Sequence, residues 1–182
     1  MINHSKNFVI LALGGNLGDR YKNLKSTIKL INSKNFKIKK TSNFYESKAL
    51  LKDGSKPEWN LPFLNCAISG YTDLKPNDLL DYTQNIERII NTNREKGNWS
   101  PREVDVDIIF YNNEIIDQHD LKIPHLEIEN RLFVLYPIKD LDSNWKNPRL
   151  ENYSLNNHIE KLEKKTPKNE RPQIINKLNY ND

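Results

Sequence analysis

Two aspartates, Asp105 and Asp107, alternate with apolar residues directly after a basic loop, in a pattern typical of a β-strand. Side chains along a strand repeat every second residue, so both carboxylates face one side with Cα atoms roughly 6.6 Å apart. Two neighbouring carboxylates repel each other unless a cation lies between them. Mg²⁺ is commonly held by one or two carboxylates together with substrate phosphates. The pair therefore predicts a site for magnesium and a phosphorylated ligand.

An isolated Asp-x-Asp is more often only the solvent-facing side of an antiparallel strand, so the flanking residues decide between the two interpretations. Arg94 and Arg102 precede the aspartates, and a guanidinium can bind phosphate oxygens through two parallel hydrogen bonds. Trp99 and Pro101 lie between these arginines. The loop favours phosphate chemistry, whereas the alternative for either arginine is a surface ion pair.

The bulk composition is consistent with one domain in a reducing compartment. A chain of 182 residues is long enough to bury a core of its own. The single cysteine, Cys66, lies in the apolar run Phe63–Ile68 and is expected to be a core residue. The first seven residues are too short and polar for a signal peptide and no apolar stretch has the length of a membrane span, so we expect a cytoplasmic protein. The net charge of +4 suits an anionic ligand.

Hydrophobic periodicity predicts strands alternating with helices in the first half of the chain. Gly14-Gly15 should end the first strand, and Pro76 should open the second helix. The long loop 47–62 is a candidate lid. The expected elements are a buried strand at Phe8–Leu13, a helix at Tyr21–Asn32, one strand from Phe36 through Tyr45, a third strand at Phe63–Tyr71 and a helix from Pro76 to about Ile90.

The second half is expected to return to the sheet and then weaken into a polar tail. After the loop 93–101 and the aspartate strand come a turn at Asn112-Asn113 and two short extended pieces, 114–116 and 121–123. The apolar run Leu132–Ile138 should re-enter the core as a helix or a strand, and Ser154 should cap a short helix. These elements favour an α+β fold with a mostly antiparallel sheet layered with helices. The expected division is a domain over 1–163 and a polar tail or linker over 164–182.

Several motifs in order resemble one known family. They are Leu13-Gly14-Gly15-Asn16-Leu17-Gly18-Asp19, Phe63-Leu64-Asn65, Gln84 to Glu87, Trp99-Ser100-Pro101-Arg102 leading to Asp105 and Asp107, Pro124-His125, and Asn130-Arg131-Leu132-Phe133. In this order and spacing they closely resemble the 6-hydroxymethyl-7,8-dihydropterin pyrophosphokinases of folate biosynthesis, over about the first 140 residues. The strongest element is Trp-x-Pro-Arg-x-x-Asp-x-Asp.

The resemblance implies a ferredoxin-like sheet and transfer of the terminal pyrophosphoryl group of ATP to the hydroxymethyl oxygen of the pterin, with release of AMP. Asp105 and Asp107 would hold two Mg²⁺ ions that bridge the triphosphate. Implied as catalytic are Arg94, Arg102, Asp105 and Asp107. Implied for ATP binding are Gln84, Glu87, Arg94, Trp99, Arg102, Ile108, His125 and Arg131, and for the pterin Ser47, Leu50, Phe63, Asn65, Trp99 and Phe133.

Each implied contact also has an ordinary structural interpretation. A phenylalanine such as Phe63 or Phe133 most often fills the core, and His125 after a proline can be a capped turn residue. A buried amide such as that of Asn65 must find partners in either case. The chain departs from the family where Asn91-Thr92-Asn93-Arg94 replaces Gly-Arg-x-Arg and where Lys48-Ala49-Leu50-Leu51 replaces Pro-Pro-Leu-Gly.

Two other functions compete with the pyrophosphokinase interpretation. Ferredoxin-like folds host RNA-binding modules, but the central strands here read Ile-Leu-Ala-Leu-Gly and Val-Asp-Val-Asp, and those carboxylates would repel a phosphate backbone. We therefore expect small-molecule substrates and neither nucleic acid nor membrane as a partner. A catalytically silent domain of the same fold is the second alternative. The tail suits a junction to dihydropteroate synthase, to which this kinase is fused in some organisms, or an ordinary C-terminus.

Overall fold

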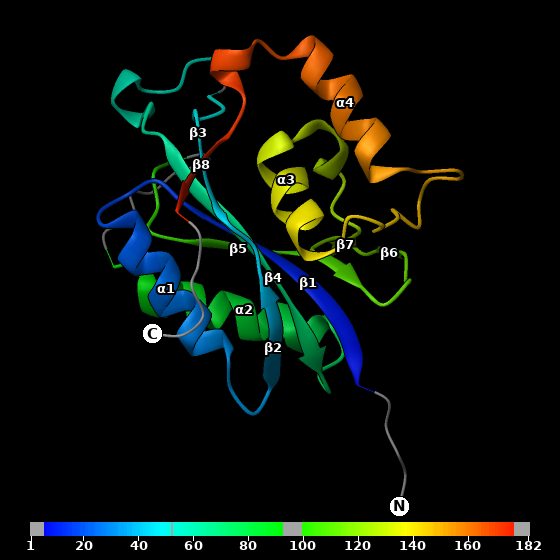
Figure 1. The fold of residues 1–182 in the computed structure, drawn as a ribbon. Coiled ribbons are helices and arrows are strands. Elements are labelled where there is room, and N and C mark those ends of the chain that lie inside the picture. Colours follow the sequence, from blue (N-terminus) through cyan, green and yellow to red (C-terminus); the bar gives the residue numbers. More distant parts are fainter. Residues whose placement is uncertain (1–5, 52, 93–99, 177–182) are drawn as a thin grey trace, which may run out of the picture.

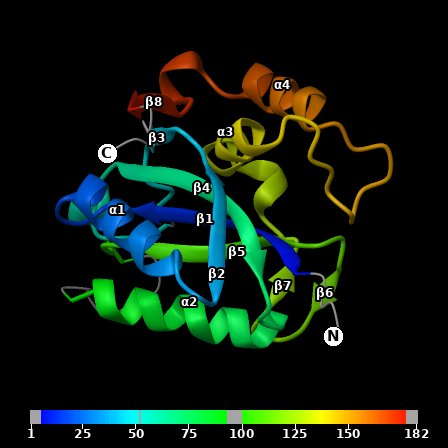
Figure 2. The same ribbon diagram turned by 60° about the horizontal axis from the view of Figure 1, so that its bottom comes forward.

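An antiparallel sheet lies between two layers of helices in the computed structural model, which describes residues 6–51, 53–92 and 100–176 (Figure 1). Helices α1 and α2 cover one face of the sheet, and α3 covers the other with α4 packed beside it. The turned view in Figure 2 separates these layers clearly. The predicted α+β architecture, an antiparallel sheet layered with helices, is confirmed.

The elements follow the chain in this order. The strands of the main sheet are β1 (Asn7–Gly15), β2 (Phe36–Thr41), β3 (Phe44–Ser47), β4 (Phe63–Thr72), β5 (Asp105–Tyr111) and β8 (Gln173–Asn176), and the helices are α1 (Arg20–Ile31), α2 (Pro76–Ile90), α3 (Leu132–Leu141) and α4 (Leu155–Lys165). A separate two-stranded ribbon is formed by β6 (Ile116–Asp117) and β7 (Lys122–Ile123), and short 3₁₀ turns are η1 (Pro57–Trp59), η2 (Ile128–Asn130) and η3 (Lys168–Glu170).

Strand β1 is the centre of the molecule, as its apolar sequence predicts. The sheet order is β5-β1-β4-β3-β8, and β2 also pairs with β4. Val9 and Leu11 pack in a core with α1 and α2, whereas Ile10 packs in a second core with α3. Because a strand buried on both faces cannot be polar on either, the run Phe8–Leu13 has no alternation. The strand ends at Gly15, where the site begins.

Local signals place the helices close to their expected positions. The Asp19 carboxylate accepts the N–H of Lys22 at 3.0 Å and caps α1. Pro76 occupies the first turn of α2, where its missing N–H would have no helical partner. Ser154 caps α4 as predicted. The run 132–138, left open between helix and strand, is helical in α3.

The predicted single strand from Phe36 through Tyr45 is wrong in one respect, because the structure divides it into β2 and β3. Both strands pair with β4, and the break falls at Ser42. There the Ser42 hydroxyl accepts the N–H of Ala67 at 2.8 Å, while the Ser42 N–H donates to the Ala67 carbonyl at 2.9 Å. A side chain thus replaces one backbone partner, which lets the strand bend without leaving a buried N–H unpaired.

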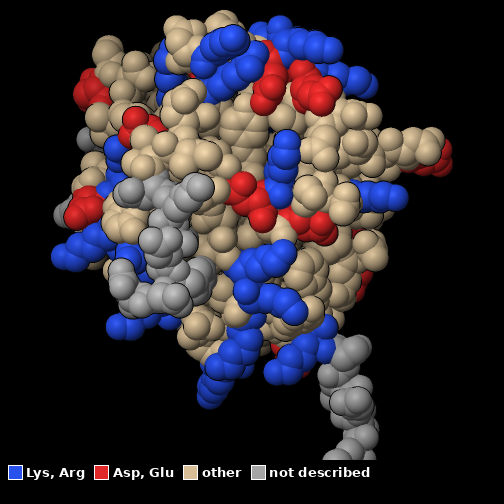
Figure 3. All heavy atoms as spheres, in the orientation of Figure 1, with Lys and Arg blue, Asp and Glu red and all other residues tan. Residues whose placement is uncertain are grey.

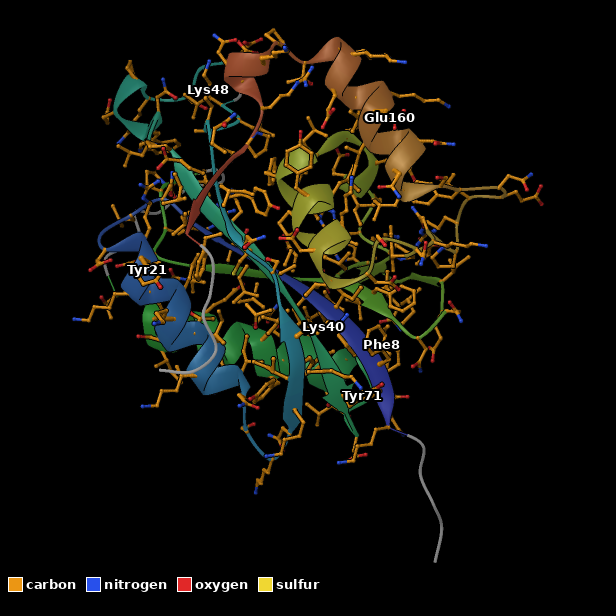
Figure 4. The ribbon with its side chains drawn as sticks, in the orientation of Figure 1. Phe8, Tyr21, Lys40, Lys48, Tyr71 and Glu160 are labelled. Atoms are coloured by element: carbon orange, nitrogen blue, oxygen red, sulfur yellow. The ribbon has the colours of Figure 1, made fainter. Side chains whose placement is uncertain are left out.

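The break also brings α3 onto the sheet. Lys40, labelled in Figure 4, donates to the carbonyl of Leu141 at 2.9 Å. The Asp140 carboxylate accepts from Tyr45 and from both the backbone and the amide of Asn43. These contacts fix the C-terminal end of α3 and leave its N-terminal end directed at the site.

The segment after residue 163, expected as a polar tail or linker, contributes the end of a helix and one strand. Helix α4 continues to Lys165, and β8 pairs with the outer edge of β3, with Tyr45 opposite Ile174. An uncovered strand edge exposes unpaired backbone groups, and β8 supplies partners for them. Between α4 and β8 the residues are mostly exposed, and Figure 3 shows Lys and Arg mixed with Asp and Glu over this rim. No helix among the described residues has both the length and the apolar character needed to span a membrane.

Replacing Ser42 by alanine should destabilise the protein by about 1–3 kcal/mol, because the buried Ala67 N–H loses its acceptor. Denaturant unfolding followed by circular dichroism measures this change. The matched control is Ser26→Ala on α1, where alanine favours the helix and the free energy of unfolding should shift by no more than about 0.5 kcal/mol. Equal effects of the two substitutions would contradict the assigned role of Ser42.

Candidate active site

A cavity open to solvent lies where β1, β4 and β5 meet the start of α3 and the loop after β3. Its lining is part acidic, part basic and part aromatic. Nine of the residues expected from the sequence line it, namely Ser47, Leu50, Phe63, Asn65, Arg102, Asp105, Asp107, Arg131 and Phe133.

The two aspartates lie side by side as predicted. In the ladder with β1, Asp105 is opposite Gly14 and Asp107 is opposite Ala12. Both line the cavity, whereas Val104 and the residues that alternate with the aspartates pack in the core beneath α1 and α2. The alternation of the strand therefore separates the acidic face from the apolar one.

The two neighbouring carboxylates carry an electrostatic penalty. Burial, together with the negative charges of Asp105 and Glu87, raises the pKa of Asp107 to about 7, against the opposing pull of Arg102 and Arg131. Arg102 Nη2 lies 2.5 Å from Asp105 Oδ2, so part of the negative charge is compensated. Asp107 has no such direct partner among the described residues and carries the larger penalty.

The glycine pair at the end of β1 serves close packing against the arginine segment. A Cβ on Gly15 would lie 2.1 Å from the Glu103 carbonyl oxygen, a distance that no side chain tolerates. The N–H groups of Asn16 and Leu17 both donate to the Arg102 carbonyl, at 3.0 and 3.1 Å, and Asn16 Oδ1 accepts the Arg102 N–H at 3.0 Å. The Gly-Gly-Asn turn therefore fixes Arg102, which in turn reaches Asp105.

Side chains at the end of α2 form hydrogen bonds along the edge of β5 that faces away from β1. Asn91 pairs with both backbone groups of Val104, donating to its carbonyl at 2.8 Å and accepting its N–H at 2.9 Å. Glu87 Oε1 accepts the N–H of Val106 at 2.6 Å. Asp105 thus lies between Val104 and Val106, whose backbone groups are hydrogen-bonded to side chains at the end of α2. The asparagine that departs from the family pattern has a structural role, which its sequence context gave no means to foresee.

The apolar side of the cavity contains two partly buried rings, Phe63 from β4 and Phe133 from α3. A guanidinium lies over each ring: Arg102 at 5.9 Å from the centroid of Phe63 and Arg131 at 5.8 Å from that of Phe133. The same arginines can therefore contact a charged group at one edge and support an aromatic surface at the other.

A buried amide lies next to these rings. Asn65 Nδ2 donates to Ser47 Oγ at 2.9 Å and to the Tyr45 carbonyl at 3.3 Å. These bonds orient the side chain and join β4 to the point where the loop after β3 begins. Lys48, labelled in Figure 4, follows Ser47 and lies 3.5 Å from Glu170 in η3.

His125 lies just outside the cavity lining. Its Nδ1 accepts the N–H of Glu127 at 3.2 Å, which leaves the proton on Nε2 in the neutral ring. Burial lowers the pKa of His125, and the charge of Arg131 adds to this effect, while Glu127 and Asp105 oppose it. The ring is therefore neutral near pH 7 and within electrostatic reach of the site.

Three other expected residues also lie outside the cavity lining. Gln84 and Glu87 line a separate hollow on α2 with Arg88 and Asn91. Ile108 is 5% exposed and packs in the core beneath α1 and α2. Arg94 and Trp99 fall outside the described residues.

Sequence reasoning missed several residues that line the cavity. Trp59 in η1 lines it, and so does Cys66, whose thiol pKa is raised by burial. The sequence indicates Asn16 only as part of a glycine motif, whereas in the structure it forms hydrogen bonds that fix the backbone of Arg102. Of these, only Trp59 had a usable signal, because an aromatic residue in a long polar loop needs an apolar surface to pack on.

The family model described as 7,8-dihydro-6-hydroxymethylpterin-pyrophosphokinase (HPPK) matches residues 10–143. The 2-amino-4-hydroxy-6-hydroxymethyldihydropteridine pyrophosphokinase of Aquifex aeolicus is 36% identical over 136 residues, which are 75% of this chain and 81% of that protein. The folate synthesis bifunctional protein of Chlamydia caviae is 40% identical over 134 residues, and the bifunctional protein FolKE of Lactococcus lactis (strain MG1363) is 43% identical over 135. This chain aligns with 30% and 37% of those two proteins, about a third of their length.

Solved structures support the same fold. A crystal structure of a Plasmodium falciparum HPPK-DHPS double variant with pterin and p-hydroxybenzoate has a TM-score of 0.72 and 15% identity, covering 96% of this chain and 48% of that one. Because the family model matches well over half of this chain and the Aquifex relative is covered over most of its length, the chain belongs to the 7,8-dihydro-6-hydroxymethylpterin-pyrophosphokinase family.

Proposed function

We propose that this chain transfers pyrophosphate from ATP to the hydroxymethyl oxygen of 6-hydroxymethyl-7,8-dihydropterin and releases AMP, as a step in folate synthesis. Family membership supports the reaction class. The observation that carries the proposal is that one cavity joins the acidic pair Asp105 and Asp107 to arginines and to the rings of Phe63 and Phe133. A flat pterin and a triphosphate need those two kinds of surface next to each other.

The acidic pair fits magnesium by its chemistry. Burial and the neighbouring negative charges raise the pKa of the Asp107 carboxyl to about 7. A divalent cation bound at this carboxylate would offset both effects. We assign two Mg²⁺ ions to Asp105 and Asp107, with the remaining ligands from phosphate oxygens and water. Within the described chain, no group of three or more His, Cys, Asp and Glu side chains is placed to hold a metal ion. Bound Mg²⁺ would supply charge neutralisation along the triphosphate and fix its geometry.

The arginines are assigned to the phosphates. Arg102 Nε is buried and has no hydrogen-bond partner among the described residues, so it is a donor in need of an oxygen. Arg131 lies close enough to Asp107 to influence its pKa. Arg94 is assigned to the leaving phosphate by resemblance. Both guanidiniums that line the cavity are held by rings or carboxylates, which orients them before the nucleotide arrives.

The pterin is assigned to the opposite end of the cavity. Phe63 and Phe133 give aromatic faces, and the Asn65 amide reads the edge of the ring system. Ser47 and Leu50, with Trp59 and Trp99, would close over the bound bicycle and exclude water, which otherwise competes with the alcohol for the phosphoryl group. Gln84, Glu87, Ile108 and His125 remain assigned to the nucleotide end by resemblance, since none of them lines the cavity.

The setting of the chain in the cell is also a proposal. We infer fusion to, or association with, a further folate enzyme such as dihydropteroate synthase, because the chain covers about a third of two bifunctional relatives. We place it in the cytoplasm, which agrees with a single cysteine that is buried and free.

The decisive experiment measures AMP formed from ATP and Mg²⁺ with and without hydroxymethyldihydropterin. The wild type should release AMP only with the pterin, and Asp105→Ala or Asp107→Ala should lower the rate by at least about 10³-fold, because each removes a cation ligand from the transition state. Chelation of the metal should have the same effect as either substitution. AMP release without pterin would refute the proposal, and so would AMP release by a variant that carries both Asp105→Ala and Asp107→Ala. A nucleic-acid-binding module or a catalytically silent domain would release no AMP under any of these conditions.

The raised pKa of Asp107 predicts a pH-dependent stability in magnesium-free buffer. Because the folded state favours the protonated carboxyl, this contribution to stability is present at low pH and is lost as the pH rises from about 4 to about 7. Asp107→Asn mimics the protonated form, so at pH 8 it should be more stable than the wild type by on the order of 1–2 kcal/mol, with the difference shrinking toward pH 5. Chemical denaturation at both pH values tests this, and an identical difference at pH 5 and 8 would count against it.

Trp59 should contribute to pterin binding but not to ATP binding. Trp59→Ala is expected to raise KM for the pterin about fivefold to tenfold through loss of aromatic contact, and Trp59→Phe should recover most of the loss. Steady-state kinetics with each substrate varied in turn gives both constants. Leu30→Ala, at an exposed leucine on α1 outside the cavity, is the control and should leave both unchanged. If Trp59→Ala raised KM for ATP more than KM for the pterin, the assignment of Trp59 to the pterin would be wrong.

A further inference from the structure

The segment between β7 and α3 carries two of the residues assigned to the nucleotide, His125 and Arg131, yet it contains little regular structure of its own. Its support comes from residues after 143, where the family match ends. The ribbon β6–β7 that precedes it has only two residue pairs, Ile116 with Ile123 and Asp117 with Lys122. A two-stranded ribbon of this size is not stable alone.

One side chain, Arg149, holds the end of this ribbon. Its Nη1 and Nη2 bind the two carboxylate oxygens of Asp117 at 3.0 and 2.8 Å. The second N–H of Nη2 is shared between the carbonyl oxygens of Ile116, at 3.1 Å, and Ile123, at 2.9 Å, and Nε donates to the carbonyl oxygen of Pro124 at 3.4 Å. The guanidinium therefore joins both strands of the ribbon and reaches the residue directly before His125.

Arg149 is itself fixed to the opposite end of the same segment. Its backbone N–H donates to Asn147 Oδ1 at 3.0 Å, and Asn147, which is 1% exposed, donates to Glu129 Oε1 at 2.9 Å. A second bond joins His158 Nε2 to the carbonyl oxygen of Glu129 at 2.7 Å. Residues 147–158 thus hold the segment at its start, beside His125, and near its end, two residues before Arg131.

The contact set requires an arginine. A planar guanidinium has five N–H donors, and it can bind a carboxylate with two of them while its other donors reach carbonyl groups. A lysine ammonium at the same place has three donors on a single atom and cannot make the paired contact to Asp117 while it also spans the two strands. The side chain of Arg149 is only 21% exposed, so water does not compete freely for these positions.

We propose that Arg149 is a positioning residue for nucleotide binding, which fixes the Ile123–Pro124 backbone so that His125 presents its Nε2–H to the triphosphate. This inference rests on the proposed function, because His125 is a nucleotide contact only if the cavity binds ATP. Arg149 does not line the cavity, so its own side chain is not assigned to the substrate. Removal of the Arg149 side chain would leave the acidic pair and the aromatic rings in place. It would, however, free the Ile123–Pro124 backbone that sets the orientation of His125.

The test measures binding of a non-hydrolysable ATP analogue with Mg²⁺ by calorimetry, together with KM and kcat for both substrates. Arg149→Ala should weaken analogue binding and raise KM for ATP by about tenfold, since a displacement of about 1 Å at a contact residue can cost up to about 10²-fold and His125 is only one of several contacts. KM for the pterin should stay within about twofold. Arg149→Lys should recover only part of the loss. Asp117→Ala keeps the carbonyl contacts, so a smaller loss of about threefold is expected, and this variant decides the matter if Arg149→Ala does not fold.

Arg20→Ala is the matched control. Arg20 is 29% exposed and makes comparable bonds, to the Pro62 carbonyl at 2.9 Å and to Glu46 at 2.7 Å, but at the loop on the pterin side of the cavity. Its removal should leave analogue binding unchanged. A loss of ATP affinity equal to that of Arg149→Ala would indicate general loosening of the fold and would overturn the proposal.

Nitrogen NMR of the histidine rings gives a readout that does not depend on turnover. In the wild type, His125 should carry its proton on Nε2, because Nδ1 accepts the Glu127 N–H. Arg149→Ala should give a mixture of both tautomers, and His125→Gln assigns the signal. A wild type that forms no AMP refutes the proposed function, whereas unchanged analogue affinity and an unchanged His125 spectrum in Arg149→Ala refute this inference alone.

Discussion

Two carboxylates that repel each other are held on one face of a strand at the edge of the sheet, and much of the surrounding structure serves to keep them there. Burial raises the pKa of Asp107, and the negative charges of Asp105 and Glu87 raise it further. A strand at an edge could relieve the repulsion by bending outward. It is prevented from doing so on both sides, by the ladder to β1 and by side chains from the end of α2 that occupy its outer edge.

The two helical layers divide the remaining tasks. The layer of α1 and α2 supplies the core beneath the acidic strand and grips its outer edge, so it fixes where the charges are. The layer of α3 and α4 supplies Phe133 and Arg131 at the start of a helix whose far end is tied down by Lys40.

The acidic face, the central strand and most helix positions could be predicted because each depends on a short-range pattern. Alternation places Asp105 and Asp107 on one face whatever the rest of the fold does, and Asp19 or Ser154 caps a helix through its own neighbours. What could not be predicted depends on partners distant in sequence. Asn91 pairs with Val104 and Ser42 completes the bonding of Ala67, and no local pattern indicates either contact. The strand β8 likewise depends on a distant partner, since it pairs with the edge of β3.

The pairing of β8 with β3 has a mechanical consequence. Adjacent strands lie about 4.8 Å apart, so the last described residues run within one strand spacing of the backbone that leads into the Ser47–Leu51 loop. Tension applied to the chain beyond residue 176 would act first on this ladder, and through Tyr45 and Ser47 on the rim that encloses the aromatic end of the cavity. A displacement of β8 would therefore reach the rim of the cavity through β3.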